Sequence, residues 1–213
     1  MFSLLIPRSA CSLRAIARAP PTSFLQGRCF STLPNNPHIH VFPSPSKPNT
    51  SLLSLLPTEP PTASLAIGTT TSLPPTPSTF TENPQFLAIL QSVLHSQASA
   101  FASPGGFNLG GSSGEGAGGA SQQGGMGRAN RGGWVHVSDT RNPPDWGRIA
   151  WPEDIFGSVE VDGNGNFVGE GGNYQASGTY RIVTREGVLG LTDFLREKLV
   201  QRLQELENQS HAK

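Results

Sequence analysis

The sequence has very little cysteine and few charged residues. Only two of its 213 residues are cysteines, and both of them, Cys11 and Cys29, lie near the N-terminus. The rest of the chain therefore cannot hold a disulfide, a thiolate zinc site or a cysteine-ligated iron–sulfur cluster. Charged residues make up 14%, and 15 Lys and Arg balance 15 Asp and Glu, which excludes a strongly basic chain that binds polyanions along its whole length.

Long apolar runs are also absent. A transmembrane helix needs about 20 consecutive apolar residues. The best window, residues 86–102, is interrupted by glutamines, serines and a histidine. We therefore expect no transmembrane span.

Acidic residues are missing from the beginning of the chain, where the first of them is Glu59. Residues 1–30 instead carry a series of arginines among apolar and serine residues, namely Arg8, Arg14, Arg18 and Arg28. Arginine-rich segments without acids are typical of organelle transit peptides. The segment predicts a mitochondrial presequence and a matrix location. Arginines inside the apolar region argue against a secretory signal, whereas a chloroplast address stays open as an alternative.

A cleavage site follows from the end of this segment. Arg28, Cys29 and Phe30 precede Ser31, which resembles the processing signal in which arginine lies three residues before the new N-terminus. Cleavage between Phe30 and Ser31 would remove both cysteines and leave more acidic than basic residues. The mature protein would then contain no thiol.

Glycine and proline are abundant, with 25 and 19 residues respectively. Stretches rich in glycine and proline bury too little apolar surface to offset the entropy that is lost when they are ordered. This argues against one compact domain of 213 residues. Residues 31–82 are rich in Ser, Thr and Pro, and they are interpreted as a disordered spacer. Residues 104–133 are rich in Gly, and they are interpreted as a flexible linker.

An amphipathic helix is predicted between these two segments, at residues 83–103. Asn83 suits the N-cap and Pro84 the first helical position. Apolar side chains then fall mostly on one side, at Phe86, Ile89, Leu90, Val93, Leu94 and Phe101. The helix either packs onto the C-terminal domain of its own chain or docks on a partner, and the sequence leaves both possibilities open.

The C-terminal residues 134–213 are predicted to form a small α+β domain, with an antiparallel sheet of three or four strands covered by one C-terminal helix. Strands are expected at residues 134–137, 155–161 and 179–184, a turn at 162–166 that leads to Phe167 and Val168, and a helix at 192–208 capped by Thr192. The expected core is Val135, Val137, Ile155, Val159, Val161, Tyr180, Ile182, Leu191, Leu195, Leu199 and Leu203.

A domain of about 80 residues has limited burial, which favours membership of a larger complex. Its least generic stretch contains all three tryptophans among arginines and prolines. Trp and Arg are enriched at binding hot spots because they bury a large area and keep a polar or charged end. We predict a partner-binding loop that uses Arg141, Trp146, Arg148 and Trp151. The expected function is that of an accessory subunit or assembly factor of a mitochondrial complex, without catalytic activity or a cofactor.

Two alternatives of other classes remain. A small matrix enzyme would need a pocket around His136, Glu153 and Asp154, although no catalytic or metal-binding motif is complete in the sequence. An RNA-associated protein would use Arg128 and Arg131, but one Arg-Gly-Gly unit in an acidic mature chain argues against nucleic-acid binding.

The overall plan resembles that of small mitochondrial proteins of filamentous fungi. The resemblance rests on the Arg28-Cys29-Phe30-Ser31 sequence, on the segment rich in Ser, Thr and Pro, and on residues 134–139 and 152–157 of the C-terminal part. It concerns architecture, so it implies a mitochondrial location and assigns no site residue.

Overall fold

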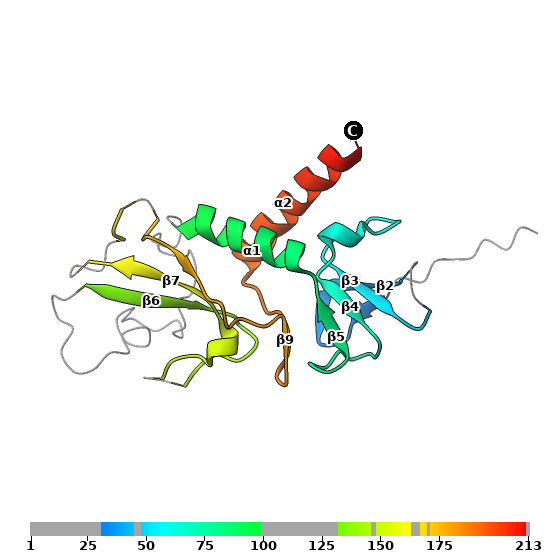
Figure 1. Ribbon diagram of the computed structural model, residues 1–213, viewed down its shortest axis with the longest axis horizontal. Coiled ribbons are helices and arrows are strands. Elements are labelled where there is room, and N and C mark those ends of the chain that lie inside the picture. The colour runs from blue at the N-terminus through cyan, green and yellow to red at the C-terminus, as the bar shows by residue number, and fades with distance from the viewer. Residues whose placement is uncertain are drawn as a thin grey trace, which may run out of the picture.

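The computed structural model describes residues 31–44, 48–98, 132–145, 148–162, 167–169 and 171–211. The predicted presequence and residues 104–131 of the predicted linker lie outside these ranges. The fold is α+β, as predicted. It consists of a five-stranded antiparallel sheet, two smaller antiparallel sheets and two α-helices (Figure 1).

The five-stranded sheet is formed by residues that were predicted to be a disordered spacer. Its strands follow in chain order as β1 (Ser31–Leu33), β2 (Asn36–Pro43), β3 (Ser51–Ser54), β4 (Gly68–Thr70) and β5 (Phe80–Glu82), with a 3-10 turn at Ala63–Leu65. The prediction for residues 31–82 is therefore wrong. Short apolar runs supply the burial that an ordered sheet needs, since Ile39, Leu53 and Ile67 are fully buried. Most prolines lie between strands, where they interrupt no ladder hydrogen bond.

Helix α1 (Pro84–Gln97) confirms the predicted helix, although it ends earlier than predicted. Asn83 caps it, because its side chain accepts a hydrogen bond from the backbone N–H of Gln85 at 3.0 Å. Its apolar face is buried in the core of the chain through Phe86, Leu90, Val93 and Leu94. Of the two possibilities that the sequence left open, the structure shows packing onto the protein itself.

The second sheet has the order β6 (Gly133–Ser138), β7 (Ile155–Val161) and β8 (Gln175–Ala176), and a 3-10 turn, Pro152–Asp154, precedes β7. Both β6 and β7 were predicted. The predicted strand at residues 179–184 is mostly wrong, because only β9 (Val183–Thr184) forms there and pairs with β10 (Gly187–Val188). The carbonyls of Arg181 and Ile182 bond instead to a buried arginine side chain.

A β-bulge changes which side chains of β7 face the core. Ser138 pairs with Ile155 and Val137 pairs with Gly157, so Phe156 is the extra residue of the bulge. Phe156 is fully buried, whereas Ile155 is only half-buried. Strict alternation along the strand had predicted that Ile155 lies in the core and that Phe156 does not. Val161 and Leu191 are also only partly buried, and the other predicted core residues are confirmed.

Helix α2 (Asp193–His211) extends slightly beyond the predicted end. The hydroxyl of Thr192 accepts a hydrogen bond from the backbone N–H of Leu195 at 3.3 Å, which confirms the predicted cap. Leu195, Leu199 and Leu203 are completely buried. Neither α-helix in the described part of the chain is long and apolar enough to cross a membrane.

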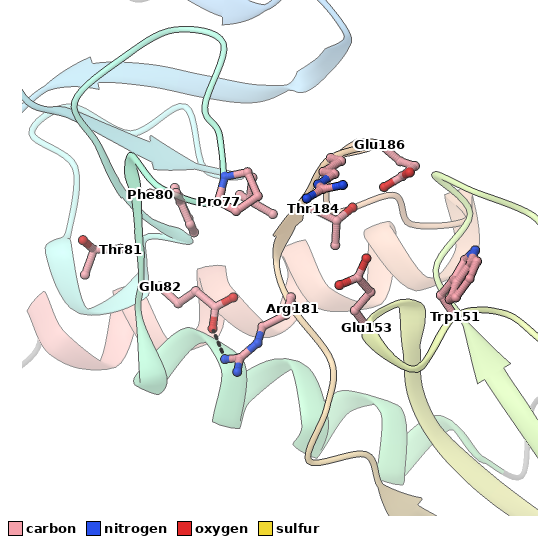
Figure 2. Close-up of a pocket in the computed structure, with 11 residues that line it drawn as sticks. Pro77, Phe80, Thr81, Glu82, Trp151, Glu153, Arg181, Thr184 and Glu186 are labelled. Carbon is pink, nitrogen blue, oxygen red and sulfur yellow. Dashed lines mark ion pairs between the residues drawn. The ribbon is translucent and has the colours of Figure 1, made fainter.

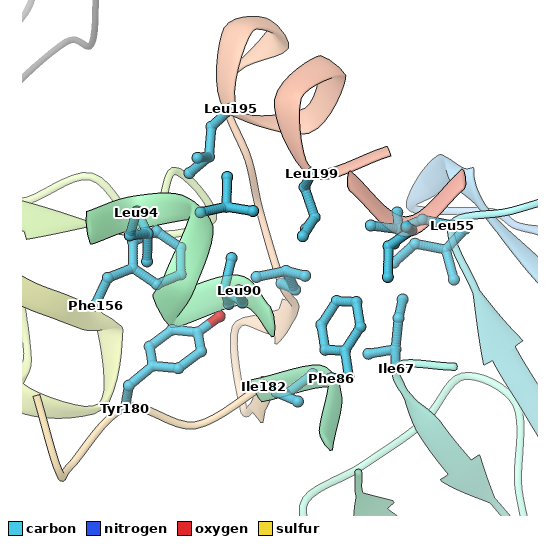
Figure 3. Packing of buried hydrophobic residues seen from close by; sticks show 14 of the residues in the cluster. Leu55, Ile67, Phe86, Leu90, Leu94, Phe156, Tyr180, Ile182, Leu195 and Leu199 are labelled. Carbon is cyan, nitrogen blue, oxygen red and sulfur yellow. The ribbon is translucent and has the colours of Figure 1, made fainter. Parts of the chain in front are cut away.

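One hydrophobic core joins the two halves of the protein, and α1 lies between them (Figure 1). Figure 3 shows Phe86 near Ile67 of the N-terminal half and Leu94 near Phe156 of β7. Gln91 of α1 also donates to the carbonyl of Phe156 at 3.1 Å. The predicted 134–213 domain therefore shares its core with residues 33–98.

We expect a fragment of residues 132–213 not to fold cooperatively, because it lacks the apolar face of α1. Its thermal unfolding, followed by circular dichroism, should show no sigmoidal transition. Mixing it with a separate fragment of residues 31–98 should restore one. A cooperative transition of the isolated 132–213 fragment would contradict the shared core.

Candidate partner-binding site

The loop at residues 142–153 is closed at its base by a buried ion pair. Arg141 precedes the loop and Asp154 follows it, and the Arg141 Nε donates to the Asp154 Oδ1 at 2.7 Å. Only 3% and 1% of these two side chains are exposed. An ion pair is stronger in surroundings of low dielectric, provided that the other polar atoms of both side chains are hydrogen-bonded. The pair therefore fixes the distance between the two ends of the loop.

The remaining donors of Arg141 bind backbone carbonyls. Its Nη1 donates to the carbonyl of Ile182 at 2.9 Å, and its Nη2 donates to those of Arg181 at 2.7 Å and Glu153 at 3.0 Å. The guanidinium thus connects the end of the loop to the segment that leads into β9.

A second carboxylate, Asp139, lies beside this pair. It accepts hydrogen bonds from the Tyr180 hydroxyl at 3.0 Å and from the backbone N–H groups of Arg141 at 2.8 Å and Gly190 at 2.9 Å. Burial raises the pKa of Asp139 to about 6, although Arg141 and these donors partly oppose the shift. A Cβ at Gly190 would lie 2.7 Å from the Asp139 carboxylate oxygen, so only glycine fits there.

The outer part of the loop is apolar and exposed. Ile149 is 42% exposed and Trp151 is 68% exposed. They line a shallow cleft of about 510 Å³, together with Pro143, Pro144 and the side chain of Arg148. Prolines restrict the backbone dihedral angles, so the loop presents its apolar side chains from a stiffened chain.

A larger cleft of about 830 Å³ lies on the other side of Trp151 (Figure 2). Its walls come from β5 and the turn before it, from Trp151 and Glu153, and from the β9–β10 hairpin. Glu82 also lines this cleft, and its carboxylate accepts a hydrogen bond from the backbone N–H of Ile182 at 2.9 Å and lies 3.9 Å from the Nη1 atom of Arg181.

The four predicted partner-binding residues differ in where the structure places them. Trp151 and Arg148 lie at the surface of the loop, as predicted. Arg141 does not, because its side chain is buried and hydrogen-bonded within the protein, so it positions the loop. Trp146 lies outside the described residues, and so do Arg28 and Phe30 of the predicted cleavage site.

The residues of the predicted enzyme pocket lie in different surroundings. Asp154 pairs with Arg141, Glu153 lines the larger cleft, and His136 lines neither of the two clefts. The Nδ1 atom of His136 lies 2.8 Å from the hydroxyl oxygen of Ser158, its cross-strand neighbour. Burial lowers the pKa of His136, which suits a neutral imidazole in that hydrogen bond.

Residues that the sequence did not single out complete the larger cleft. Phe80 and Glu82 come from the segment that was predicted to be disordered. Thr184 and Glu186 come from the β9–β10 hairpin. No local motif marks them, because they meet only through the packing of distant segments. Within the described ranges, no group of three or more His, Cys, Asp or Glu side chains could hold a metal ion.

Comparisons of the chain with protein-family models, with curated proteins and with solved structures found no match.

Replacing Arg141 should destabilise the protein far more than replacing the exposed Arg148. Arg141→Ala leaves Asp154 as an unpaired buried charge, and we expect a loss of about 3–5 kcal/mol in the free energy of unfolding. Arg148→Ala should change it little. Urea denaturation of both variants checks this, and equal stabilities would contradict the role of Arg141 as the anchor.

Stability should also depend on the protonation of Asp139. A carboxyl whose pKa is raised by folding stabilises the protein below its ordinary pKa of 3.8, and this contribution is lost as the pH rises through about 6. The unfolding free energy of the native protein relative to Asp139→Asn should fall by about 2 kcal/mol between pH 4 and pH 7. Denaturant titrations across this range measure it, with the exposed Asp145→Asn as control. A constant difference across the range would be inconsistent with the raised pKa.

Proposed function

We propose that this protein is a non-catalytic binding protein, an accessory subunit or assembly factor of a larger mitochondrial complex. The observation that supports this most directly is the exposure of Trp151 on an anchored loop. A side chain of this size contributes a large apolar area when a partner covers it. We infer that the partner is a protein and that it docks on the loop at residues 142–153.

The anchoring of the loop supports binding in a further way. Association loses less free energy when the binding segment is already held in one conformation. Here the ion pair between Arg141 and Asp154 holds the base of the loop, and Pro143, Pro144 and Pro152 limit its backbone freedom. Ile149 and Trp151 then form an apolar centre with Arg148 beside them, which is the composition of a binding hot spot.

The mitochondrial part of the proposal rests on the sequence. The arginine-rich, acid-free residues 1–30 support import, and the order of Arg28, Phe30 and Ser31 supports cleavage before Ser31. N-terminal sequencing of the protein from purified mitochondria tests both points. A chain that begins at Ser31 is the expected result. Absence of the protein from the mitochondrial fraction would contradict import, and a mitochondrial chain that still carries residues 1–30 would contradict cleavage.

Trp151→Ala should remove the protein from its complex without unfolding it. The lost apolar contact should weaken association at least about 30-fold, the effect of a binding hot spot. Native gels of gently solubilised mitochondria, with immunodetection, measure this as a shift from a large complex to the free protein. Trp134→Ala is the matched control, because Trp134 is 39% exposed and lies on β6, away from the loop.

Two outcomes would overturn the proposal. One is that the unaltered protein migrates by itself. The other is that the Trp151→Ala and Trp134→Ala variants remain in the complex to the same extent.

A further inference from the structure

One corner of the larger cleft combines an aromatic face, two carboxylates and a hydroxyl group. Trp151 and Glu153 come from the end of the anchored loop, and Thr184 and Glu186 come from the β9–β10 hairpin. Figure 2 shows Glu153 and Trp151 on one side of that hairpin, with Thr184 and Glu186 beside them. We call these four residues the acidic corner.

The carboxylates of this corner have no partner among the described residues. Glu82, elsewhere in the cleft, is occupied by the backbone N–H of Ile182 and by Arg181. Neither a hydrogen bond nor an ion pair within the described ranges involves the side chains of Glu153 and Glu186. Arg185 is the remaining cation that lines the cleft, so unpaired negative charge exceeds unpaired positive charge there.

The hydroxyl of Thr184 points to a ligand with hydrogen-bond donors. Thr184 is 5% exposed, and its Oγ1 atom has no hydrogen-bond partner among the residues that the structure describes. A buried polar atom without a partner is destabilising, so such an atom at a cleft is a sign of an incomplete site. A donor group that reaches Thr184 would complete it.

Trp151 adds a surface that attracts cations. The face of an indole ring carries negative charge density, and it binds guanidinium and ammonium groups more strongly than other aromatic side chains do. Its 68% exposure leaves this ring available to a ligand. A cation with several N–H donors could therefore interact with the aromatic face, the carboxylates and the hydroxyl group at the same time.

We infer that the acidic corner binds an arginine side chain of the partner protein. Arginine fits better than lysine, because its planar guanidinium stacks on an aromatic ring while its separate N–H groups reach several acceptors. The inference rests on the proposed function, for which it names the group that is recognised.

A short peptide tests this directly on the full chain. The probe is acetyl-Gly-Ser-Arg-Ser-Gly-amide, and its control carries citrulline, the uncharged analogue of arginine, at the central position. Binding is followed by ¹⁹F NMR of protein labelled with 5-fluorotryptophan, whose three tryptophan signals are assigned from Trp→Phe variants. The arginine peptide should shift the Trp151 signal and bind about tenfold more tightly than the citrulline peptide.

Charge variants should change the affinity in opposite directions. Glu153→Gln and Glu186→Gln each remove one carboxylate, so they should weaken binding of the arginine peptide several-fold. Arg185→Gln removes a competing cation, so it should strengthen binding. Thr184→Val should weaken binding without lowering the stability of the fold, because it removes a hydroxyl that has no partner. Glu197→Gln, an exposed carboxylate on α2, is the matched control and should have no effect.

Three results would overturn the inference: no binding at millimolar peptide, equal binding of both peptides, or binding that leaves the Trp151 signal unchanged. They are distinguishable from failure of the proposed function. If the complex on native gels depends on Trp151 but the peptide results are negative, the docking loop stands and only the arginine site is lost.

Discussion

The ion pair between Arg141 and Asp154 is the contact on which the candidate surface depends. It closes the loop that carries Trp151, and the same guanidinium holds the carbonyls of Arg181 and Ile182 just before β9. The side chain of Arg141 therefore contacts both the end of the loop and the segment before β9, which form two walls of the larger cleft. A change at this position would move both walls together, even though the side chain itself touches no solvent-filled part of the cleft.

Burying this charge requires that its neighbours satisfy it. Desolvation of an ion pair can exceed the attraction between its members, and the hydrogen bonds from Arg141 to three carbonyls offset that loss. The carboxylate of Asp139 also lies beside Arg141, so two carboxylates adjoin one guanidinium. Burial raises the pKa of Asp139 against the opposing charge of Arg141, so the protonation of Asp139 contributes to the stability of the loop anchor.

The surface of the candidate site could be predicted only in part. Trp151 and Arg148 were identified from composition, since tryptophan and arginine among prolines are typical of binding loops. Arg141 was misplaced because its sequence neighbours resemble those of Arg148, and only the fold brings Asp154 and two distant carbonyls to it. Glu82 and Thr184 were missed, because nothing near them in the sequence distinguishes them from other polar residues.

Local signals in the sequence determined the helices with their caps at Asn83 and Thr192, strands β6 and β7, and the α+β class. These features depend on residues a few positions apart, which periodicity and capping rules describe. The tertiary structure decided the rest. Residues 31–82 looked too poor in apolar residues to fold, yet their short runs are buried once α1 and α2 cover them. Burial is a property of contacts between distant segments, so composition counted along the chain could not show it.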